Sequence, residues 1–209
     1  MTETALTLYV DQQFSSPWAM SAFVALSEKA LPFTLTTVDL AAGQARQPAF
    51  AGLAATERVP ALLHGAFALT ESSAIVEYLE ETFGAPRYRP LLPAEPKPRA
   101  LARQMQAWLR SDLQALRNER TTMTIFFTPV DSALSPAARA DADKLIRVAD
   151  RLIQGEHLFG QWCIADTELA VTLNRLLCNG HPVPPKLRDY AHAQWERASV
   201  RLWLAQPRA

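Results

Sequence analysis

The chain has 209 residues, of which 49% are hydrophobic, and its 21 Lys and Arg residues balance 21 Asp and Glu residues. This length allows one large domain or two small ones with a substantial core. The balanced charge, without a run of one sign, argues against a nucleic-acid surface or a polybasic membrane patch. The expected partner is therefore a small molecule or another protein.

The first ten residues, MTETALTLYV, lack the regions of a signal peptide, and no stretch reaches the ~18 apolar residues of a membrane helix. A cytoplasmic protein that does not enter a membrane is expected. Cys163 and Cys178 fall on one predicted helix, roughly 22 Å apart, which is too far for a disulfide. Two reduced thiols suit the cytoplasm.

Strand and helix patterns alternate in the N-terminal part of the chain. Residues 6–10 alternate between apolar and other side chains, which predicts a strand. Ser16 is a typical N-cap and Pro17 suits the first helical position, so a helix is predicted up to residue 30. The β-branched and aromatic stretch 33–40 predicts a second strand.

A weak helical pattern over residues 41–56 precedes a β-hairpin, whose strands are predicted at 59–63 and 67–70. The next helix begins near Glu71 and ends at Gly84. The order of elements is therefore βαβαββα.

Prolines are concentrated between residues 86 and 98, which excludes a helix interior or a central strand there. Beyond this segment all periodic patterns are helical; they cover residues 101–116, 136–152, 169–177 and 186–205. We therefore predict an α/β domain over 1–85, a proline-rich linker over 86–98 and an all-α domain over 99–209.

Three short motifs follow the order of these elements: residues 15–18 (SSPW), 59–60 (VP) and 71–75 (ESSAI). With the linker and the helical second half, they resemble the cytosolic glutathione S-transferases over essentially the whole chain. Residues 108–112 (WLRSD) and 159–166 (FGQWCIAD) resemble the bacterial YfcF type of this family. The resemblance implies a thioredoxin-like N-terminal domain, an all-helical C-terminal domain and a homodimer.

Ser16 stands where a redox-active domain of this fold carries its first cysteine, and the first domain contains no cysteine. A serine at a helix N-terminus can donate a hydrogen bond to the sulfur of glutathione, while the helix dipole favours the thiolate. Lowering a thiol pKa by about two units requires ~2.7 kcal/mol. The alternative interpretation is that Ser16 is only an N-cap, and Ser15 is the alternative donor.

The resemblance also implies contacts along glutathione. A cis Pro60 would turn the N–H and C=O of Val59 toward the cysteinyl main chain, whereas a trans proline at a strand start is the ordinary alternative. Glu71 and Ser72 would bind the γ-glutamyl ammonium and carboxylate at a helix N-terminus, unless they only cap the helix.

Gln47 and Arg58 are candidates for the glycine carboxylate, although such residues are often simply solvated. Trp108, Ser111 and Asp112 are candidates for the second-substrate pocket, with a core position as the alternative for Trp108.

Histidines at 64, 157, 181 and 192 show no metal-ligand spacing, so no metal is expected. Asp166 resembles the acidic end of a Ser/Thr-x-x-Asp capping box. Because Cys163 replaces the hydroxyl residue, we expect this box to be incomplete.

These features predict a glutathione transferase with glutathione as its co-substrate. A serine hydroxyl would stabilise the thiolate, which would attack an electrophile or a hydroperoxide. The alternative is a non-catalytic adaptor that keeps this fold for protein interaction.

Overall fold

The computed structural model describes residues 5–208, which form two compact units. The first unit contains the chain up to Leu91 together with the C-terminal segment from Leu202, and the second contains Leu92–Arg201. The sequence had assigned residues 202–208 to the helical domain. They join the first unit because Trp203 packs on Phe14 and Phe23.

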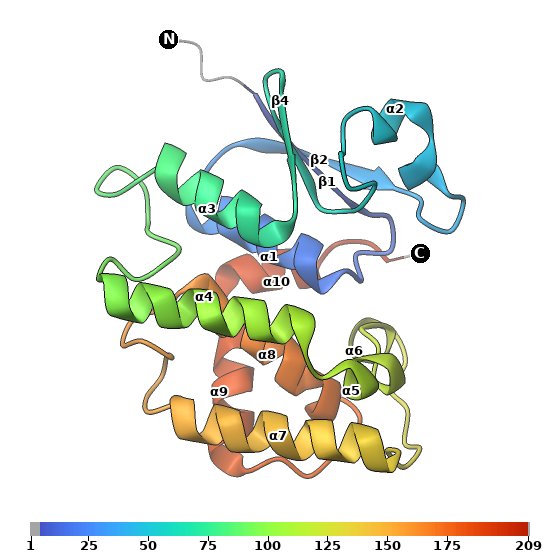
Figure 1. Cartoon of the computed structure of the whole chain (residues 1–209), viewed down its shortest axis with the longest axis vertical. Helices are drawn as coiled ribbons and strands as arrows, with labels where there is room; N and C mark the ends of the chain where they lie inside the picture. Colours follow the sequence, from blue (N-terminus) through green and yellow to red (C-terminus); the bar gives the residue numbers. More distant parts are fainter. Residues whose placement is uncertain (1–4, 209) are drawn as a thin grey trace. The chain divides into compact units, whose positions relative to one another are not determined.

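The first unit contains one mixed four-stranded sheet (Figure 1). Its strands are β1 (Leu6–Asp11), β2 (Phe33–Val38), β3 (Ala61–His64) and β4 (Phe67–Thr70). They lie in the order β2-β1-β3-β4, with β1 parallel to β2 and the other two pairs antiparallel. Leu8 is opposite Leu35 and Leu62 in this register, so the centre of β1 is at the centre of the core.

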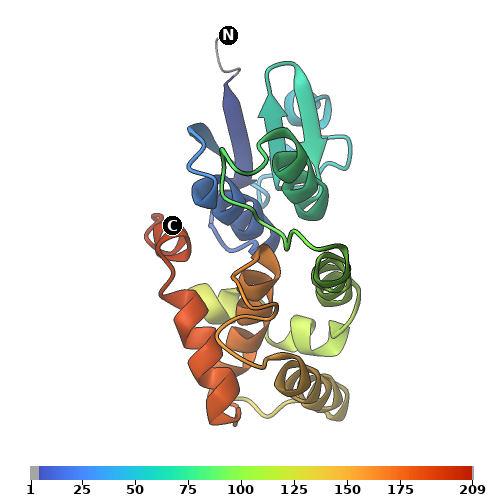
Figure 2. The ribbon, with the colours of Figure 1, turned by 90° about the vertical axis from the view of Figure 1, so that its left-hand side faces the viewer.

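The helical elements of this unit are α1 (Pro17–Glu28), η1 (Gln44–Arg46), α2 (Pro48–Ala51) and α3 (Ser72–Thr82). The predicted order βαβαββα is confirmed. Helices α1 and α3 pack side by side, as Figures 1 and 2 show. Successive side chains of a strand face opposite sides of the sheet. Tyr9 accordingly packs against Phe50 of α2, at a ring-centroid distance of 5.8 Å.

Lys29 fastens the end of α1 to the chain that follows α3. Its side chain is completely buried, and Nζ donates to Glu80 Oε2 at 2.8 Å, to the Phe83 carbonyl at 2.7 Å and to the Arg89 carbonyl at 3.0 Å. A buried ammonium is tolerated only when its charge and its donors are all satisfied. These bonds fix the chain segment that follows α3 against the end of α1.

The second unit is all-helical, as predicted. Its helices are α4 (Pro96–Ser111), α5 (Gln114–Glu119), α6 (Met123–Phe126), α7 (Pro136–Leu152), α8 (Ile164–Leu177) and α9 (Pro185–Trp195), and α10 (Ala198–Leu204) continues into the first unit.

Three boundaries differ from the sequence-based expectation. Helix α4 begins at Pro96, inside the predicted linker, because proline is compatible with a first helical turn. The helix predicted over 101–116 is divided by Leu113, whose φ of +59° cannot continue a right-handed helix. The helix predicted over 186–205 is likewise divided into α9 and α10.

The start of α8 corrects the expectation of an incomplete capping box. The Cys163 sulfur accepts the N–H of Asp166, and Asp166 Oδ2 accepts the N–H of Cys163 at 2.9 Å. The other carboxylate oxygen accepts from the Leu158 N–H at 2.7 Å and from the Tyr190 hydroxyl at 2.8 Å. The box is complete because a thiol sulfur is also an acceptor.

Cys163 and Cys178 flank α8 as its N-cap and C-cap, and both are free thiols. Burial, reinforced by the Asp166 carboxylate, raises the pKa of the Cys163 thiol far above its usual value. None of the helices in the described chain has the length and apolar character needed to cross a membrane.

Candidate active site

The loop between β1 and α1 is organised by the carboxylate of Asp11, the last residue of β1. Asp11 is only 4% exposed. Its Oδ2 accepts the N–H of Ser15 at 2.7 Å, and its Oδ1 accepts the N–H of Ser16 at 3.1 Å. The chain turns back at Phe14, whose N–H donates to the Asp11 carbonyl at 3.0 Å. Both serine amides therefore face the same carboxylate.

The two serine hydroxyls have different partners. The Ser15 hydroxyl donates to Asp11 Oδ2 at 3.0 Å. Ser16 is the N-cap of α1, as predicted, and its oxygen accepts the N–H of Ala19 at 3.2 Å. A hydroxyl that acts as an acceptor still carries one hydrogen to donate. Of these two serines, Ser16 is the one whose hydroxyl hydrogen has no acceptor within the described residues.

The peptide bond between Val59 and Pro60 is cis, as the resemblance implies. Val59 is half-buried and packs on a cluster that includes Phe50 and Ala61, just before β3 begins. The cluster fixes its side chain. No hydrogen bond within the described residues uses its backbone N–H or C=O.

Glu71 immediately precedes α3 and has an unusual backbone conformation, with φ +68° and ψ 113°. A positive φ is costly for a residue with a Cβ, and residues strained in this way cluster at active sites and ligand-binding positions. The Glu71 side chain is exposed and makes no cap hydrogen bond, whereas Ser72 is 3% exposed at the first position of the helix. The exposed carboxylate is therefore available at a helix N-terminus.

Gln47 and Arg58 are both exposed, in the segment between β2 and β3. Gln47 lines a hollow of about 290 Å³, together with Tyr9, Thr37 and Phe50. Arg58 does not line this hollow. The structure thus places Gln47 at a concave surface.

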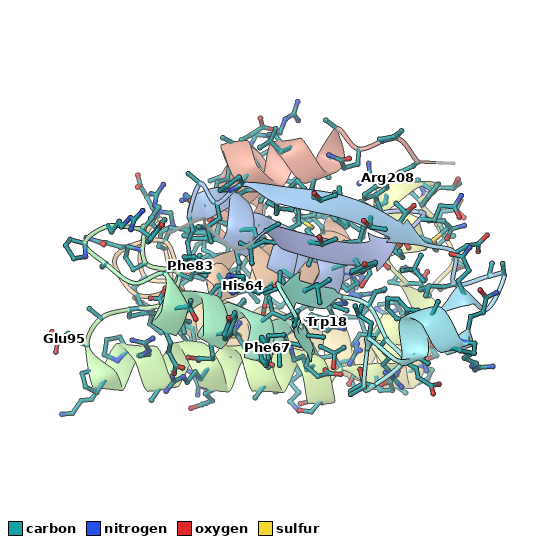
Figure 3. All side chains as sticks on the ribbon, turned by 90° about the horizontal axis from the view of Figure 1, so that it is seen from above. Trp18, His64, Phe67, Phe83, Glu95 and Arg208 are labelled. Atoms are coloured by element: carbon teal, nitrogen blue, oxygen red, sulfur yellow. The ribbon has the colours of Figure 1, made fainter. Side chains whose placement is uncertain are left out.

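A second hollow, of about 230 Å³, lies beside Ser15 and includes Asp11, Gln13 and Leu40 in its lining. A larger hollow of about 370 Å³ in the same unit lies elsewhere, around Leu6 at the opposite end of β1. Phe83 also lines this larger hollow and lies beside His64 (Figure 3). This larger hollow is separate from the serines.

The three second-substrate candidates lie together at the end of α4, in the second unit. Trp108 is half-buried, and its indole N–H donates to Asp112 Oδ2 at 2.7 Å. The exposed Ser111 donates its hydroxyl to the Ala107 carbonyl at 3.0 Å. An ion pair with Lys144, helped by hydrogen bonds from the Leu113 N–H and from Trp108, lowers the pKa of Asp112 to about 2.

Sequence reasoning did not identify Asp11, because nothing in the linear spacing shows that the loop folds back onto it. The signal that was present is an acidic residue ending a buried strand four residues before a pair of serines. Among the described residues, no three His, Cys, Asp or Glu side chains are placed to hold a metal ion.

Comparison with known families decides the relationship. The model of the glutathione S-transferase N-terminal domain matches residues 15–82, and that of the C-terminal domain matches residues 95–208. The second match alone covers more than half of the chain. The chain belongs to the glutathione S-transferase family.

Individual members of the family agree with this assignment. Human glutathione S-transferase theta-1 is 32% identical in an alignment that covers 78% of this chain and 72% of that protein. Maleylacetoacetate isomerase of Dictyostelium discoideum is 29% identical over 80% of this chain and 74% of that protein. The narrower resemblance to the YfcF type stays a prediction.

A solved structure provides a closer relative. A glutathione transferase homologue from Burkholderia, crystallised with bound glutathione, is 46% identical and has a TM-score of 0.81. The alignment covers 96% of each chain. The glutathione transferase fold of this chain, with its thioredoxin-like sheet and its helical C-terminal part, agrees with that relative over nearly its entire length.

Proposed function

We propose that this protein is a glutathione transferase in which the Ser16 hydroxyl donates a hydrogen bond to the sulfur of glutathione. One observation carries the choice of serine: the Ser15 hydroxyl hydrogen is directed to Asp11, whereas the Ser16 oxygen only accepts from Ala19. The bound glutathione of the Burkholderia relative supports glutathione as the co-substrate here.

The chemistry follows from the position of Ser16 at the start of α1. A hydrogen bond to the thiolate and the positive end of the helix dipole both stabilise the charged form, so the pKa of the bound thiol falls. The thiolate then attacks an electrophilic carbon, a carbon–sulfur bond forms, and the leaving group departs with its electron pair.

The remaining parts of glutathione would be bound along the edge of the α/β fold. The free N–H and C=O of Val59, beside Pro60, suit the cysteinyl main chain. The exposed Glu71 carboxylate suits the γ-glutamyl ammonium, with Ser72 at the helix N-terminus for the carboxylate.

The opposite end of the site would bind the glycine carboxylate and the second substrate. Gln47, which lines a hollow, is a better candidate for the glycine carboxylate than Arg58. Trp108, Ser111 and Asp112 remain proposed second-substrate residues. We also propose that the protein is cytoplasmic and forms a homodimer. Light scattering of the purified protein tests the dimer directly.

Two further reactions use the same thiolate. Reduction of hydroperoxides is one, and isomerisation is the other, since two of the relatives are named maleylacetoacetate isomerases. Assays with an aryl halide, an organic hydroperoxide and maleylacetoacetate would rank the three reactions. Ser16→Ala should then be assayed in the reaction that the wild-type protein catalyses fastest. Loss of that activity in the variant supports the proposal for that reaction.

A non-catalytic adaptor is the rival from another class. Binding to immobilised glutathione, followed by elution with free glutathione, separates the two. The proposal predicts retention and specific elution of the wild-type protein. A folded protein that passes through the column without retention would contradict it.

A further inference from the structure

The C-terminal segment lies against the loop that carries the two serines (Figure 1). Trp203 is completely buried, with its ring centroid 5.3 Å from that of Phe14 and 5.4 Å from that of Phe23. Its indole N–H has no hydrogen-bond partner in the described chain, so ring packing holds the side chain in place. The segment therefore contacts the residue two positions before Ser16.

Arg208 ties the end of this segment to the same loop. Its Nη2 donates to the Phe14 carbonyl at 3.4 Å and to the Trp203 carbonyl at 3.2 Å, and its Nη1 donates to the Leu204 carbonyl at 2.7 Å. Burial lowers the pKa of the Arg208 guanidinium, and the attraction of the Asp11 carboxylate opposes this change.

The backbone conformation of Phe14 has to be held in place by its neighbours. Its φ of +50° lies in the left-handed region, which an aromatic residue rarely adopts without constraint. Trp203 packs on its ring, Arg208 contacts its carbonyl, and Asp11 accepts its N–H through the backbone carbonyl. These contacts hold the turn that brings Ser15 and Ser16 back to Asp11.

We infer that Asp11 and Arg208 are positioning residues for the thiolate of glutathione, an inference that rests on Ser16 as the donor in the proposed function. The Asp11 carboxylate binds both serine amides and the Ser15 hydroxyl hydrogen, which fixes the Ser16 hydroxyl at the start of α1. Arg208 acts on the same loop from the C-terminal segment. Neither residue touches the sulfur.

Such a role predicts an effect on the bound thiol with little effect on glutathione affinity. The measurement is the ultraviolet absorbance of the thiolate in the enzyme–glutathione complex, titrated against pH, together with kcat and the glutathione KM. The variants are Asp11→Asn, Arg208→Met and, as the reference for the sulfur donor, Ser16→Ala. Arg201→Met is the matched control, because Arg201 is exposed on α10 and its guanidinium pairs with the surface residue Glu196 at 3.6 Å.

Asp11→Asn keeps the side-chain volume but replaces one acceptor oxygen with an NH₂ group that faces a serine donor. We expect the pKa of bound glutathione to rise and kcat/KM at neutral pH to fall about tenfold, with the glutathione KM changed less than about twofold. Arg208→Met should shift both quantities in the same direction, by about threefold in kcat/KM. Arg201→Met should behave as wild type.

The double variant Asp11→Asn/Arg208→Met tests whether the two residues act together. If they do, the double variant loses no more activity than Asp11→Asn alone. Multiplied losses would show that Arg208 acts independently and would remove it from this role.

Two failures are distinguishable. A wild-type titration for Asp11→Asn, with a raised pKa for Ser16→Ala, would overturn the positioning role and leave the proposed function intact. A wild-type titration for Ser16→Ala would overturn the proposed function itself. Circular dichroism checks that each variant is folded, and Arg208→Met, at the partly exposed end of the chain, tests the inference if Asp11→Asn is unfolded.

Discussion

Two helix starts in this protein combine an aspartate with an N-cap, and they serve different ends. At α1, Asp11 accepts both serine amides, and the half-buried Ser16 keeps one hydroxyl hydrogen available. At α8, Asp166 is completely buried and each carboxylate oxygen is already bonded. An aspartate near an N-cap thus leaves a donor unused at the proposed site and forms a buried, fully bonded network at the start of α8.

The contrast also shows why Cys163, at the α8 cap, is poorly suited to act as a nucleophile. A helix N-terminus lowers the pKa of an accessible thiol. Burial and the adjacent Asp166 carboxylate outweigh that effect at Cys163, so its pKa is raised. The site proposed for chemistry uses the thiol of a ligand at the open cap of α1 instead.

The largest expected effect is on stability, at the buried start of α8. Asp166→Ala leaves the Leu158 and Cys163 amides and the Tyr190 hydroxyl without their acceptor in the core. We expect a loss of about 3–5 kcal/mol in the free energy of unfolding, measured by urea denaturation. Asp150→Ala is the control, because Asp150 pairs with Lys186 at the surface and should lose less than about 1 kcal/mol. Equal losses in the two variants would contradict the account of α8.

An intermediate effect is expected at the open start of α3. Glu71→Ala removes the carboxylate proposed for the γ-glutamyl ammonium, so the glutathione KM should rise about tenfold while kcat at saturating glutathione changes little. Glu81→Ala, an exposed glutamate on the same helix, is the control. Steady-state kinetics with varied glutathione make the measurement, and an unchanged KM would place the γ-glutamyl end elsewhere.

The smallest effect is expected at Cys163. Cys163→Ser restores the ordinary hydroxyl cap, so the unfolding free energy should change by less than about 1 kcal/mol and kcat/KM should remain at the wild-type value.

In the wild-type protein the raised pKa of Cys163 leaves less thiolate than in a free cysteine at every pH between about 7 and 9. Alkylation with peptide mass spectrometry should therefore label the half-buried Cys178 before Cys163. Faster labelling of Cys163 would show that the α8 cap is open.

Local sequence signals predicted the strand and helix order, the N-cap at Ser16 and the all-helical second half. These features depend on side-chain periodicity and on residues next to each other in the chain. The cis peptide at Pro60 came from family resemblance, because a proline alone permits either isomer.

Other features depend on contacts that sequence spacing does not contain. The burial of Lys29 requires carbonyls from the chain that follows α3. The turn that presents the serines to Asp11 requires Phe14 in a conformation unusual for its type. The packing of Trp203 on the first unit joins segments almost two hundred residues apart. The break at Leu113 runs against the helix preference of leucine.

The central claim is that the Ser16 hydroxyl stabilises the thiolate of bound glutathione, and a pH titration of thiolate absorbance tests it most directly. The complexes to compare are wild type, Ser16→Ala and Ser15→Ala. We predict that Ser16→Ala raises the thiol pKa by about one to two units and lowers kcat/KM at neutral pH by about 10- to 100-fold. Ser15→Ala should titrate close to wild type. A raised pKa in Ser15→Ala with an unchanged Ser16→Ala would reverse the two roles, and unchanged titrations in both would assign the thiolate to backbone N–H groups alone.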